Sequence, residues 1–379
     1  MTTPSWPLPA TVHLSDLGPL GPSISAPTAQ SRGIQVPARY PEWLAKLYQQ
    51  PRRPDEARHL DALVAAPRAL TPAERGVLLG SSSWPVARIT ADNGATLGCV
   101  IPKAPDRFKA TLTAGKAKET RYVEVDWLAH TGEAIRRVGL SVPTDADRLK
   151  AVTSLVSVAA ILDRLDLVYS DWSYSNSFWS PALHQVYVID IDGCQTGKTP
   201  NLCQPNWDDP LTPRTSPADK YTDRYRVALL AARCLTGLRD PEALRTVTQL
   251  GTRHSLPGLP EALLDCLLST DRERRPSSGL LLTVLAGGPY VRPMPRPVRS
   301  PLPPARPAVN VRPTVVIPSA PTKPTATRST AANQNPTVNA GANRRTGAPG
   351  QPASGSPVIG CVILAVLAAI VIIFAAVHH

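Results

Sequence analysis

A run of twenty residues near the end of the chain, Val358 to Val377, contains no charged residue and no proline. A helix of that length would be about 30 Å long, which matches the hydrocarbon core of a bilayer. A buried helix of a soluble domain would normally carry a polar face. The run therefore predicts one transmembrane helix, so the remaining residues have to fold outside the bilayer.

The flanks of this run predict its orientation. Arg344 and Arg345 come before it, whereas only His378 and His379 follow it. Because positively charged flanks stay in the cytoplasm, we expect a single-pass protein of the cell membrane with its large N-terminal part in the cytoplasm.

The segment before the run has an unusual composition. Pro289 to Pro357 holds sixteen prolines and nine basic residues but no acidic residue. Such a segment buries too little apolar surface to offset the entropy lost on ordering. We therefore expect a disordered linker, partly in the polyproline conformation.

The linker also accounts for most of the net charge of +12. Nine of the 41 basic residues lie in it, so the rest of the chain has 32 basic and 29 acidic residues, a net charge of +3. A basic segment beside a membrane favours binding to anionic lipid headgroups. Nucleic-acid binding would require stacking aromatic residues, and Tyr290 is the only aromatic residue of the linker, so we expect no nucleic-acid partner.

The N-terminal third shows strand patterns. Trp84 to Ile101 alternates apolar and polar residues around Asn93-Gly94, which is a strong hairpin signal. Glu42 to Tyr48 is a short apolar stretch, and Pro54 to Ala65 has helical spacing. We expect a small antiparallel sheet that carries one helix.

Lys46 lies at the centre of the apolar stretch. A lysine on a strand that faces a core needs an anionic partner, so Lys46 is a candidate for binding phosphates. Glu56 or Asp61 could supply its ion-pair partner. The alternative is a surface lysine whose stem covers apolar surface.

Two glycines near the start of the chain are a second candidate for phosphate binding. Gly18 and Gly21 could belong to a glycine-rich loop whose amides cover phosphates. Pro19 and Pro22 remove two of those amides, which favours an ordinary turn.

From about residue 146 onward the pattern becomes helical. Apolar residues recur at helical spacing in four segments: Arg148–Leu167, Lys220–Gly237, Leu259–Leu268 and Ser277–Leu285. A sheet followed by helices predicts an α+β protein.

Three polar residues follow the first of these helices in a spaced pattern. Asp171 precedes Asn176 by five residues, and a short apolar run then ends in Asp190. A carboxylate can orient a hydroxyl, while an amide oxygen and a second carboxylate can bind Mg²⁺. The pattern predicts a metal-nucleotide site.

The order of these segments resembles the protein kinase superfamily. YSDWSYSN is similar to its catalytic loop, VIDID to its metal-binding motif, YTDRYRVALLAARCLTG to a buried helix and DRERRPSSGLLL to its closing signature. The resemblance covers residues 14–287 and implies two lobes, about 14–101 and 106–287. A disordered stretch, 1–13, would precede them, and the linker 288–357 and the helix 358–377 would follow.

The resemblance also implies roles for single residues. Asp171 would be the catalytic base, Asn176 and Asp190 would bind Mg²⁺, and Lys46 would bind the phosphates of ATP. Asp223 would bind the backbone of the catalytic loop. Arg275 would be the structural arginine of the closing signature.

Departures from the family pattern leave the activity open. Tyr169 and Ser170 replace a histidine and an arginine of the catalytic loop, Ser173 replaces its lysine, and Asp192 replaces a glycine. One hypothesis is a membrane-anchored Ser/Thr kinase of low activity. The alternatives are a pseudokinase, acting as a nucleotide-binding or scaffolding module at the membrane, and phosphotransfer to a small molecule.

Overall fold

The structure is a computed structural model that describes residues 5–294 except 29, 54–56, 203 and 240–241. These residues belong to one unit, Met1–Leu302. The apolar run 358–377 and almost all of the expected linker lie outside the described residues. Within the described part, no helix combines the length and the apolar character that a membrane span requires.

The N-terminal part forms a six-stranded sheet in the order β1-β5-β6-β4-β3-β2. The strands are β1 (Thr11–His13), β2 (Leu20–Ser23), β3 (Ser31–Pro37), β4 (Trp43–Arg52), β5 (Ala87–Thr90) and β6 (Thr96–Pro102). All neighbouring strands are antiparallel except β1 and β5, which are parallel. The predicted hairpin around Asn93-Gly94 is confirmed, because β5 and β6 pair on either side of it.

The strand β4 lies between β3 and β6. Its close contact with β6 depends on Gly98, since a Cβ atom there would lie 2.0 Å from the carbonyl oxygen of Lys46. A larger residue at 98 would push the two strands apart. The sheet thus holds Lys46 from both sides.

Two helices accompany the sheet, not the single helix expected from the sequence. They are α1 (Arg58–Ala65) and α2 (Pro72–Gly80). Thr71 and Glu74 form a capping box at the start of α2, and Pro72 occupies its first turn, a position that tolerates proline. The capping signature was present in the sequence as TPAE.

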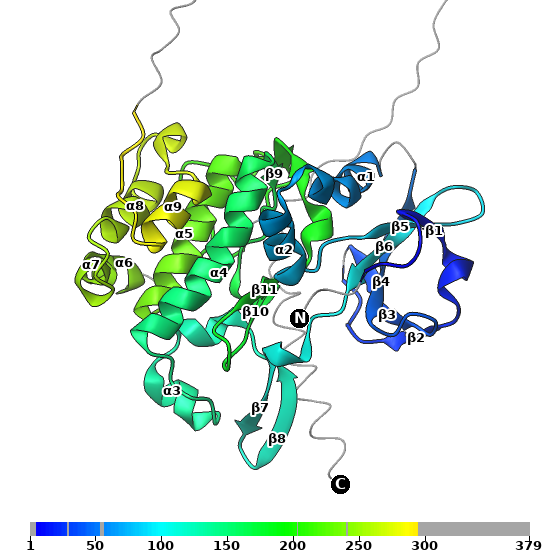
Figure 1. Ribbon diagram of the computed structural model, residues 1–379, viewed down its shortest axis with the longest axis horizontal. Coiled ribbons are helices and arrows are strands. Elements are labelled where there is room, and N and C mark those ends of the chain that lie inside the picture. Colours follow the sequence, from blue (N-terminus) through cyan, green and yellow to red (C-terminus); the bar gives the residue numbers. More distant parts are fainter. Residues whose placement is uncertain (1–4, 29, 54–56, 203, 240–241, 295–379) are drawn as a thin grey trace, which may run out of the picture. The chain divides into compact units, whose positions relative to one another are not determined.

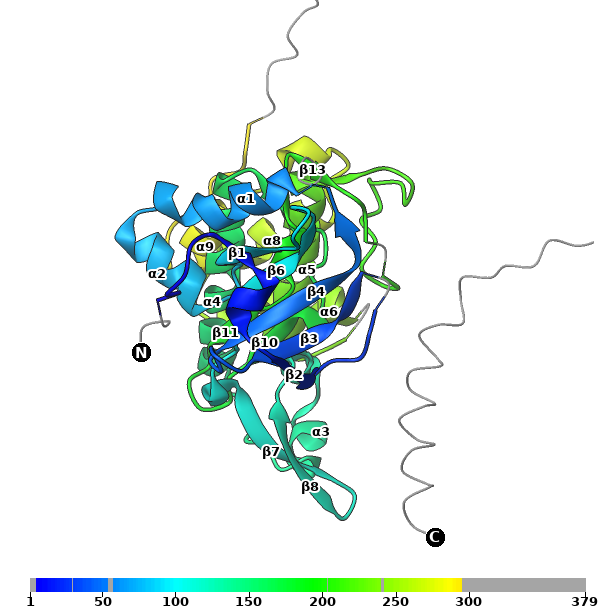
Figure 2. The same cartoon turned by 90° about the vertical axis from the view of Figure 1, so that its right-hand side faces the viewer.

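A hairpin follows the sheet. Its strands, β7 (Lys109–Ala114) and β8 (Ala117–Tyr122), pair only with each other among the described strands. They project from the rest of the unit in both views (Figures 1 and 2). We call residues 109–122 the basic ribbon.

The C-terminal part is helical. Its larger helices are α4 (Asp145–Arg164), α5 (Lys220–Thr236), α8 (Leu259–Leu267) and α9 (Ser278–Leu285), and its shorter ones are α3 (Gly132–Arg137), α6 (Glu242–Thr246) and α7 (Leu250–Arg253). The helix α4 packs against α5 and α9, and Figure 1 shows these three side by side. The four helical segments predicted from periodicity are confirmed with bounds shifted by a few residues.

Short strands connect these helices. They form three antiparallel pairs: β9 (Leu167–Val168) with β12 (Gln195–Thr196), β10 (Ser177–Trp179) with β11 (Val186–Val188), and β13 (Lys198–Thr199) with β14 (Ala218–Asp219). The candidate residues Asp171, Asn176 and Asp190 lie in the turns between them.

The folded part extends beyond the expected bounds at both ends. Thr11–His13 forms β1, and Trp6 packs against Tyr40 and Trp43, so the fold begins before residue 14. At the other end, Arg292 forms ion pairs with Glu261 and Asp265 of α8. The first residues of the expected linker therefore contact the domain.

Candidate functional site

Lys46 lies in β4 and is only 7% exposed. Its Nζ donates hydrogen bonds to Asp192 Oδ1 at 2.7 Å and to Asp190 Oδ1 at 3.3 Å. Burial by itself would lower the pKa of Lys46, but the charges of Asp192 and Asp190 outweigh burial and raise it above its ordinary value. Lys46 is therefore a buried cation and not a surface lysine.

The partner of Lys46 differs from both residues suggested by the sequence. Asp61 is paired with Arg88, whose Nε lies 2.7 Å from Asp61 Oδ1. Glu56 lies outside the described residues. Asp192, which is 4% exposed, supplies the counter-charge instead, from the helical part of the chain.

Asp190 follows β11 closely and has a left-handed backbone conformation, with φ 59° and ψ 30°. An aspartate tolerates this conformation better than most residues. Its side chain is 42% exposed, in contrast to the buried side chain of Asp192. Of the two carboxylates that contact Lys46, Asp190 is thus the one that remains open to a ligand.

Asp171 follows a turn that α5 holds in place. Ser170 has a φ of 62°, and Asp223 of α5 accepts hydrogen bonds from the backbone N–H of Tyr169 at 2.7 Å and of Ser170 at 2.8 Å. Two charge-assisted bonds stabilise a backbone conformation that a serine rarely adopts. The contact expected of Asp223 is present.

Burial alters the acidity of both carboxyl groups. It raises the pKa of Asp171 to about 6, and the negative charge of Asp190 acts in the same direction, while the side-chain amides of Asn176 and Gln204 oppose the shift. Burial likewise raises the pKa of Asp223 to about 7 against the two backbone hydrogen bonds. A carboxyl group with a pKa near neutrality is suited to accept a proton.

Asn176 is oriented by its own loop. Its Nδ2 donates to the backbone oxygen of Asp171 at 2.9 Å, and its backbone oxygen accepts from the N–H of Ile189 at 3.0 Å. Because the amide nitrogen is used in this way, Oδ1 of Asn176 is left as an acceptor. The second bond places Asn176 beside the segment that carries Asp190.

The donor set fits Mg²⁺ in the manner expected for a nucleotide complex. Mg²⁺ is commonly bound through one or two carboxylates, with phosphates and water completing the octahedron. Asp190 and the Oδ1 of Asn176 would provide such a set. No group of three or more acidic, histidine or cysteine side chains suited to a metal occurs among the described residues.

Gln204 is a site residue that the sequence did not reveal. Its Nε2 donates to Asp171 Oδ1 at 2.5 Å, across 33 positions of the chain. This bond to a carboxylate is short and charge-assisted. Gln204 therefore fixes one oxygen of the candidate base.

Arg226 of α5 links the Asp171 turn to the segment that follows it. Its guanidinium donates to the backbone oxygen of Ser170, to Trp207 O at 3.1 Å and to Asn201 Oδ1 at 2.8 Å. Arg226 stands three positions after Asp223, so the two residues share one face of α5. That spacing was the available sequence signal for Arg226.

Arg275 anchors the end of the same segment. It forms a bidentate ion pair with Asp209. Both N–O distances are 2.7 Å, and both side chains are fully buried. Arg275 also donates to the backbone oxygen of Tyr221 at 2.9 Å. The structural role expected of Arg275 agrees with these contacts.

The two glycines suggested for phosphate binding lie in a turn and in a strand near the start of the chain. Gly18 follows a 3₁₀ turn, its N–H donates to Ser15 O, and it packs against Arg39. Gly21 lies within β2, next to Val36. Their contacts are those of a turn and a strand, which is the alternative that Pro19 and Pro22 favoured.

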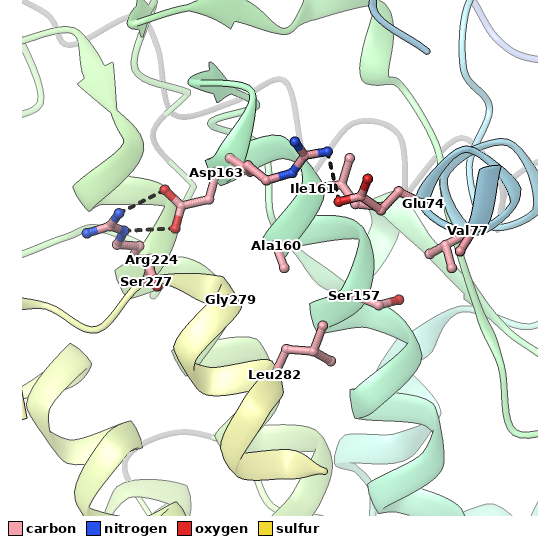
Figure 3. A pocket seen from close by; sticks show the side chains of 12 residues that line it. Glu74, Val77, Ser157, Ala160, Ile161, Asp163, Arg224, Ser277, Gly279 and Leu282 are labelled. Carbon is pink, nitrogen blue, oxygen red and sulfur yellow. Dashed lines mark hydrogen bonds and ion pairs between the residues drawn. The ribbon is translucent and has the colours of Figure 1, made fainter. Parts of the chain in front are cut away.

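A groove of about 570 Å³ opens between α2, α4 and α9, and none of the candidate residues lines it (Figure 3). Its charged side chains are already paired: Glu74 with Arg164 at 2.8 Å, and Asp163 with Arg224 at 2.9 Å. The groove has no free charged group to bind a phosphate. The candidate site therefore remains the group formed by Lys46, Asp190 and Asp192.

Comparisons with known proteins give one kind of match. No protein-family model matches the chain, and no curated protein does. Among solved structures, a double mutant of the PknI kinase domain of Mycobacterium tuberculosis is similar to it. The two are 14% identical with a TM-score of 0.41, over 70% of this chain and 94% of that one. The roles of the site residues have to be inferred from contacts within this chain.

Proposed function

We propose that this protein is a kinase-like protein that binds ATP with Mg²⁺ and transfers the γ-phosphate slowly to Ser or Thr hydroxyls. The observation that carries the proposal is the contact of Lys46, from the sheet, with Asp190 and Asp192, from the helical part. Asp171 and Asn176 lie beside Asp190. A cation, an open carboxylate, an amide oxygen and a base are thus gathered where two halves of the chain meet.

Each residue has a role in this proposal. Lys46 binds the α- and β-phosphates of ATP, exchanging part of its contact with Asp190 for phosphate oxygens. Asp190 and Asn176 would hold Mg²⁺, which when bound neutralises charge on the phosphates. Asp171 accepts the proton of the substrate hydroxyl while that oxygen attacks the γ-phosphorus. The bond from the γ-phosphorus to the bridging oxygen breaks, and ADP leaves.

The residue at position 173 supports slow transfer. Ser173 is buried, and its Oγ lies 3.2 Å from Ser175 Oγ. A serine supplies no positive charge to the γ-phosphate, so electrostatic stabilisation of the transition state is weaker than with a lysine.

The contacts of the segment between Asp192 and α5 are evidence that the proposed site does not need phosphorylation to be ordered. Arg226 binds Asn201 and Trp207, and Arg275 binds Asp209. These contacts already position the segment, whereas regulated kinases order it with a phosphate. At the position where such kinases have the arginine that binds this phosphate, this chain has Ser170.

Two contacts favour the second candidate function, a pseudokinase that binds nucleotide or a partner without transfer. Gln204 occupies one oxygen of Asp171, and Lys46 is already satisfied by two carboxylates. Catalysis would require Lys46 to exchange part of its contact with Asp190 for phosphate oxygens, whereas a scaffolding module would leave both contacts in place.

Placement at the membrane is part of the proposal and is supported by the sequence alone. The run 358–377 would anchor the chain, and the basic linker would bind anionic lipid headgroups. The protein substrate would then be one that reaches the cytoplasmic face of the membrane.

The test is phosphotransfer by the full-length protein. The purified chain in detergent or nanodiscs is incubated with Mg²⁺ and γ-labelled ATP, beside Asp171→Asn and Asp190→Asn variants. Asp92→Asn is the matched control, because the Asp92 side chain is fully exposed. We expect label on protein from the parent and from the control, and none from the two site variants.

Two results would contradict transfer. One is the absence of label from the parent over long incubation; ATP-induced thermal stabilisation that depends on Lys46 would then identify the pseudokinase. The other is equal labelling by the parent and Asp171→Asn, which would show that the label comes from a contaminant or from another site.

A further inference from the structure

The basic ribbon, residues 109–122, is exposed in a way that ordinary sheet strands are not. Five consecutive residues of β8, from Ala117 to Arg121, are exposed. Since side chains of a strand alternate between two faces, both faces of β8 are open to solvent. Figures 1 and 2 show the ribbon standing out from the unit.

Residues along β7 and at the base of the ribbon hold it firmly. Leu112 is buried in the core of the helical part, and the N–H of Thr113 donates to Val138 O at 2.9 Å. Tyr122 donates from its hydroxyl to Ala104 O at 2.6 Å and stacks on Phe178. An isolated two-stranded hairpin is marginally stable in water, so these contacts fix the ribbon as a defined projection.

The formal net charge of residues 1–288 comes from the ribbon. It contains Lys109, Lys116, Lys118 and Arg121 against the single acid Glu119, a net charge of +3. Residues 1–288 as a whole have 32 basic and 29 acidic residues, which is also +3. The remainder of residues 1–288 is therefore neutral, and its formal excess of charge is concentrated on this projection.

The outer face of the ribbon has a distinct composition. Register places Thr111 opposite Thr120 and Thr113 opposite Lys118 on one face, with the hydroxyls of Thr111 and Thr120 2.8 Å apart. The aromatic residue of this face, Tyr122, is covered by Lys109 at 5.0 Å and stacked on Phe178. No aromatic ring of the ribbon is left to stack on a nucleic-acid base.

We propose that the basic ribbon binds the anionic phospholipid surface of a membrane and orients the folded part against it. Lys116 and Lys118 lie at or next to the tip and Arg121 lies nearer the base, while Lys109 is paired with Asp106 at 2.7 Å. Exposed basic side chains gain affinity for such a surface, about fivefold for each residue. That gain is small for a free domain. It becomes effective when the chain is held near the bilayer, as the run 358–377 predicts, because tethering raises the local concentration of lipid.

The experiment measures how close the tip lies to the bilayer in the full-length chain. Cys203 and Cys361 are replaced by serine, since the four described cysteines are buried, and Ala114→Cys adds a fluorescent label at the exposed tip. The chain is reconstituted in nanodiscs of phosphatidylcholine alone or with phosphatidylserine, each containing a headgroup quencher. Quenching by the bilayer is the readout.

The variants separate the ribbon from net charge. The ribbon variant is Lys116→Gln, Lys118→Gln and Arg121→Gln; the control is Arg58→Gln, Arg68→Gln and Arg274→Gln, which removes three exposed basic residues elsewhere. We expect the label to be quenched in anionic nanodiscs, and we expect added salt to weaken this quenching. The ribbon variant should show severalfold less quenching than the parent, and the control variant should show the same quenching as the parent. Equal melting temperatures of the two variants show that both are folded.

Three outcomes would overturn the proposal. The first is the same quenching in zwitterionic and anionic nanodiscs. The second is the same quenching in the ribbon variant and the control. The third is no lipid-dependent quenching together with ribbon-dependent binding to an oligonucleotide or to polyglutamate, which would assign the surface to another acidic partner.

Discussion

The Nζ of Lys46 lies 2.7 Å from Oδ1 of Asp192, although 146 positions separate the two residues in the chain. Lys46 belongs to a central strand of the sheet, and Asp192 belongs to the helical part. No acidic residue of α1 or α2 among the described positions contacts Lys46. The charge balance of this lysine thus couples the two parts of the domain directly.

This coupling predicts the effect of removing Asp192. Asp192→Asn leaves Lys46 buried with Asp190 as its remaining charged partner, so we expect the free energy of unfolding to fall by about 1–3 kcal/mol. Asp190→Asn should reduce stability less, because Asp190 is half-exposed and lies at the longer distance. Urea denaturation measures both; a larger loss for Asp190→Asn would contradict the assignment of Asp192 as the main partner.

Gln204 allows a second prediction that concerns catalysis. Because Gln204 contacts the carboxylate of Asp171, we expect Gln204→Leu to lower kcat by about tenfold, a part of the usual contribution of a general base, and to leave KM for ATP unchanged. Gln185→Leu is the matched control at an exposed position. Steady-state phosphotransfer rates give both constants. A kcat that rises in Gln204→Leu would show that Gln204 blocks the base and does not orient it.

The acidity of Asp171 predicts a pH dependence of the reaction. The base has to be ionised, and burial raises its pKa to about 6, so the rate should increase from about pH 5 to about pH 7 with a midpoint near the pKa. A pH profile of kcat/KM at constant ionic strength measures this. A rate that is flat over this range would exclude Asp171 as the titrating base.

The same group predicts a pH dependence of stability. Its pKa is raised from 3.8 to about 6 on folding, so the folded state favours the protonated form. The stability that Asp171 contributes is present below about pH 4 and is lost as the pH rises through about 6. The free energy of unfolding of the parent, relative to Asp171→Asn, should therefore decrease over this range; denaturation at several pH values checks the sign.

The buried pair of Arg275 and Asp209 predicts a large loss of stability on breaking it. Arg275→Met leaves the Asp209 carboxylate buried without its cation, which costs about 3–5 kcal/mol. Asp209→Leu combined with Arg275→Met should recover most of that loss, since no charge is left unpaired. A double-mutant cycle in urea measures the interaction. If the double variant is as unstable as the sum of the single ones, the two residues do not act as a pair.

Much of the fold could be predicted from local sequence patterns. Gly237 ends α5 with a φ of 73°, and Asn93-Gly94 turns between β5 and β6, as glycine chemistry predicts. Periodicity predicted α4, α5, α8 and α9 because their apolar faces repeat regularly. The mixed sheet was larger than expected, because β1, β2 and β3 are short or contain proline and glycine, and their alternation is weak.

The sequence predicted some of the candidate site residues. The residues that it did not predict were missed for a common reason. Asp223 and its contacts with the turn at Ser170 followed from an ordered motif. Asp192, Gln204 and Arg226 act through contacts that join distant segments, and no local pattern reports them. Asp192 could be read from the sequence only as a missing glycine, whereas in the structure it is the counter-ion of Lys46.

The counter-ion of Lys46 also restricts how this chain can change over generations. The lysine and Asp192 can be lost together at little cost, because neither then remains buried and unpaired. Replacing Asp192 alone would leave Asp190 as the remaining charged partner of the buried lysine, so a new acid that faces Lys46 would have to appear first for the fold to keep its full stability. Acquiring the two substitutions in the reverse order would pass through a weakened fold.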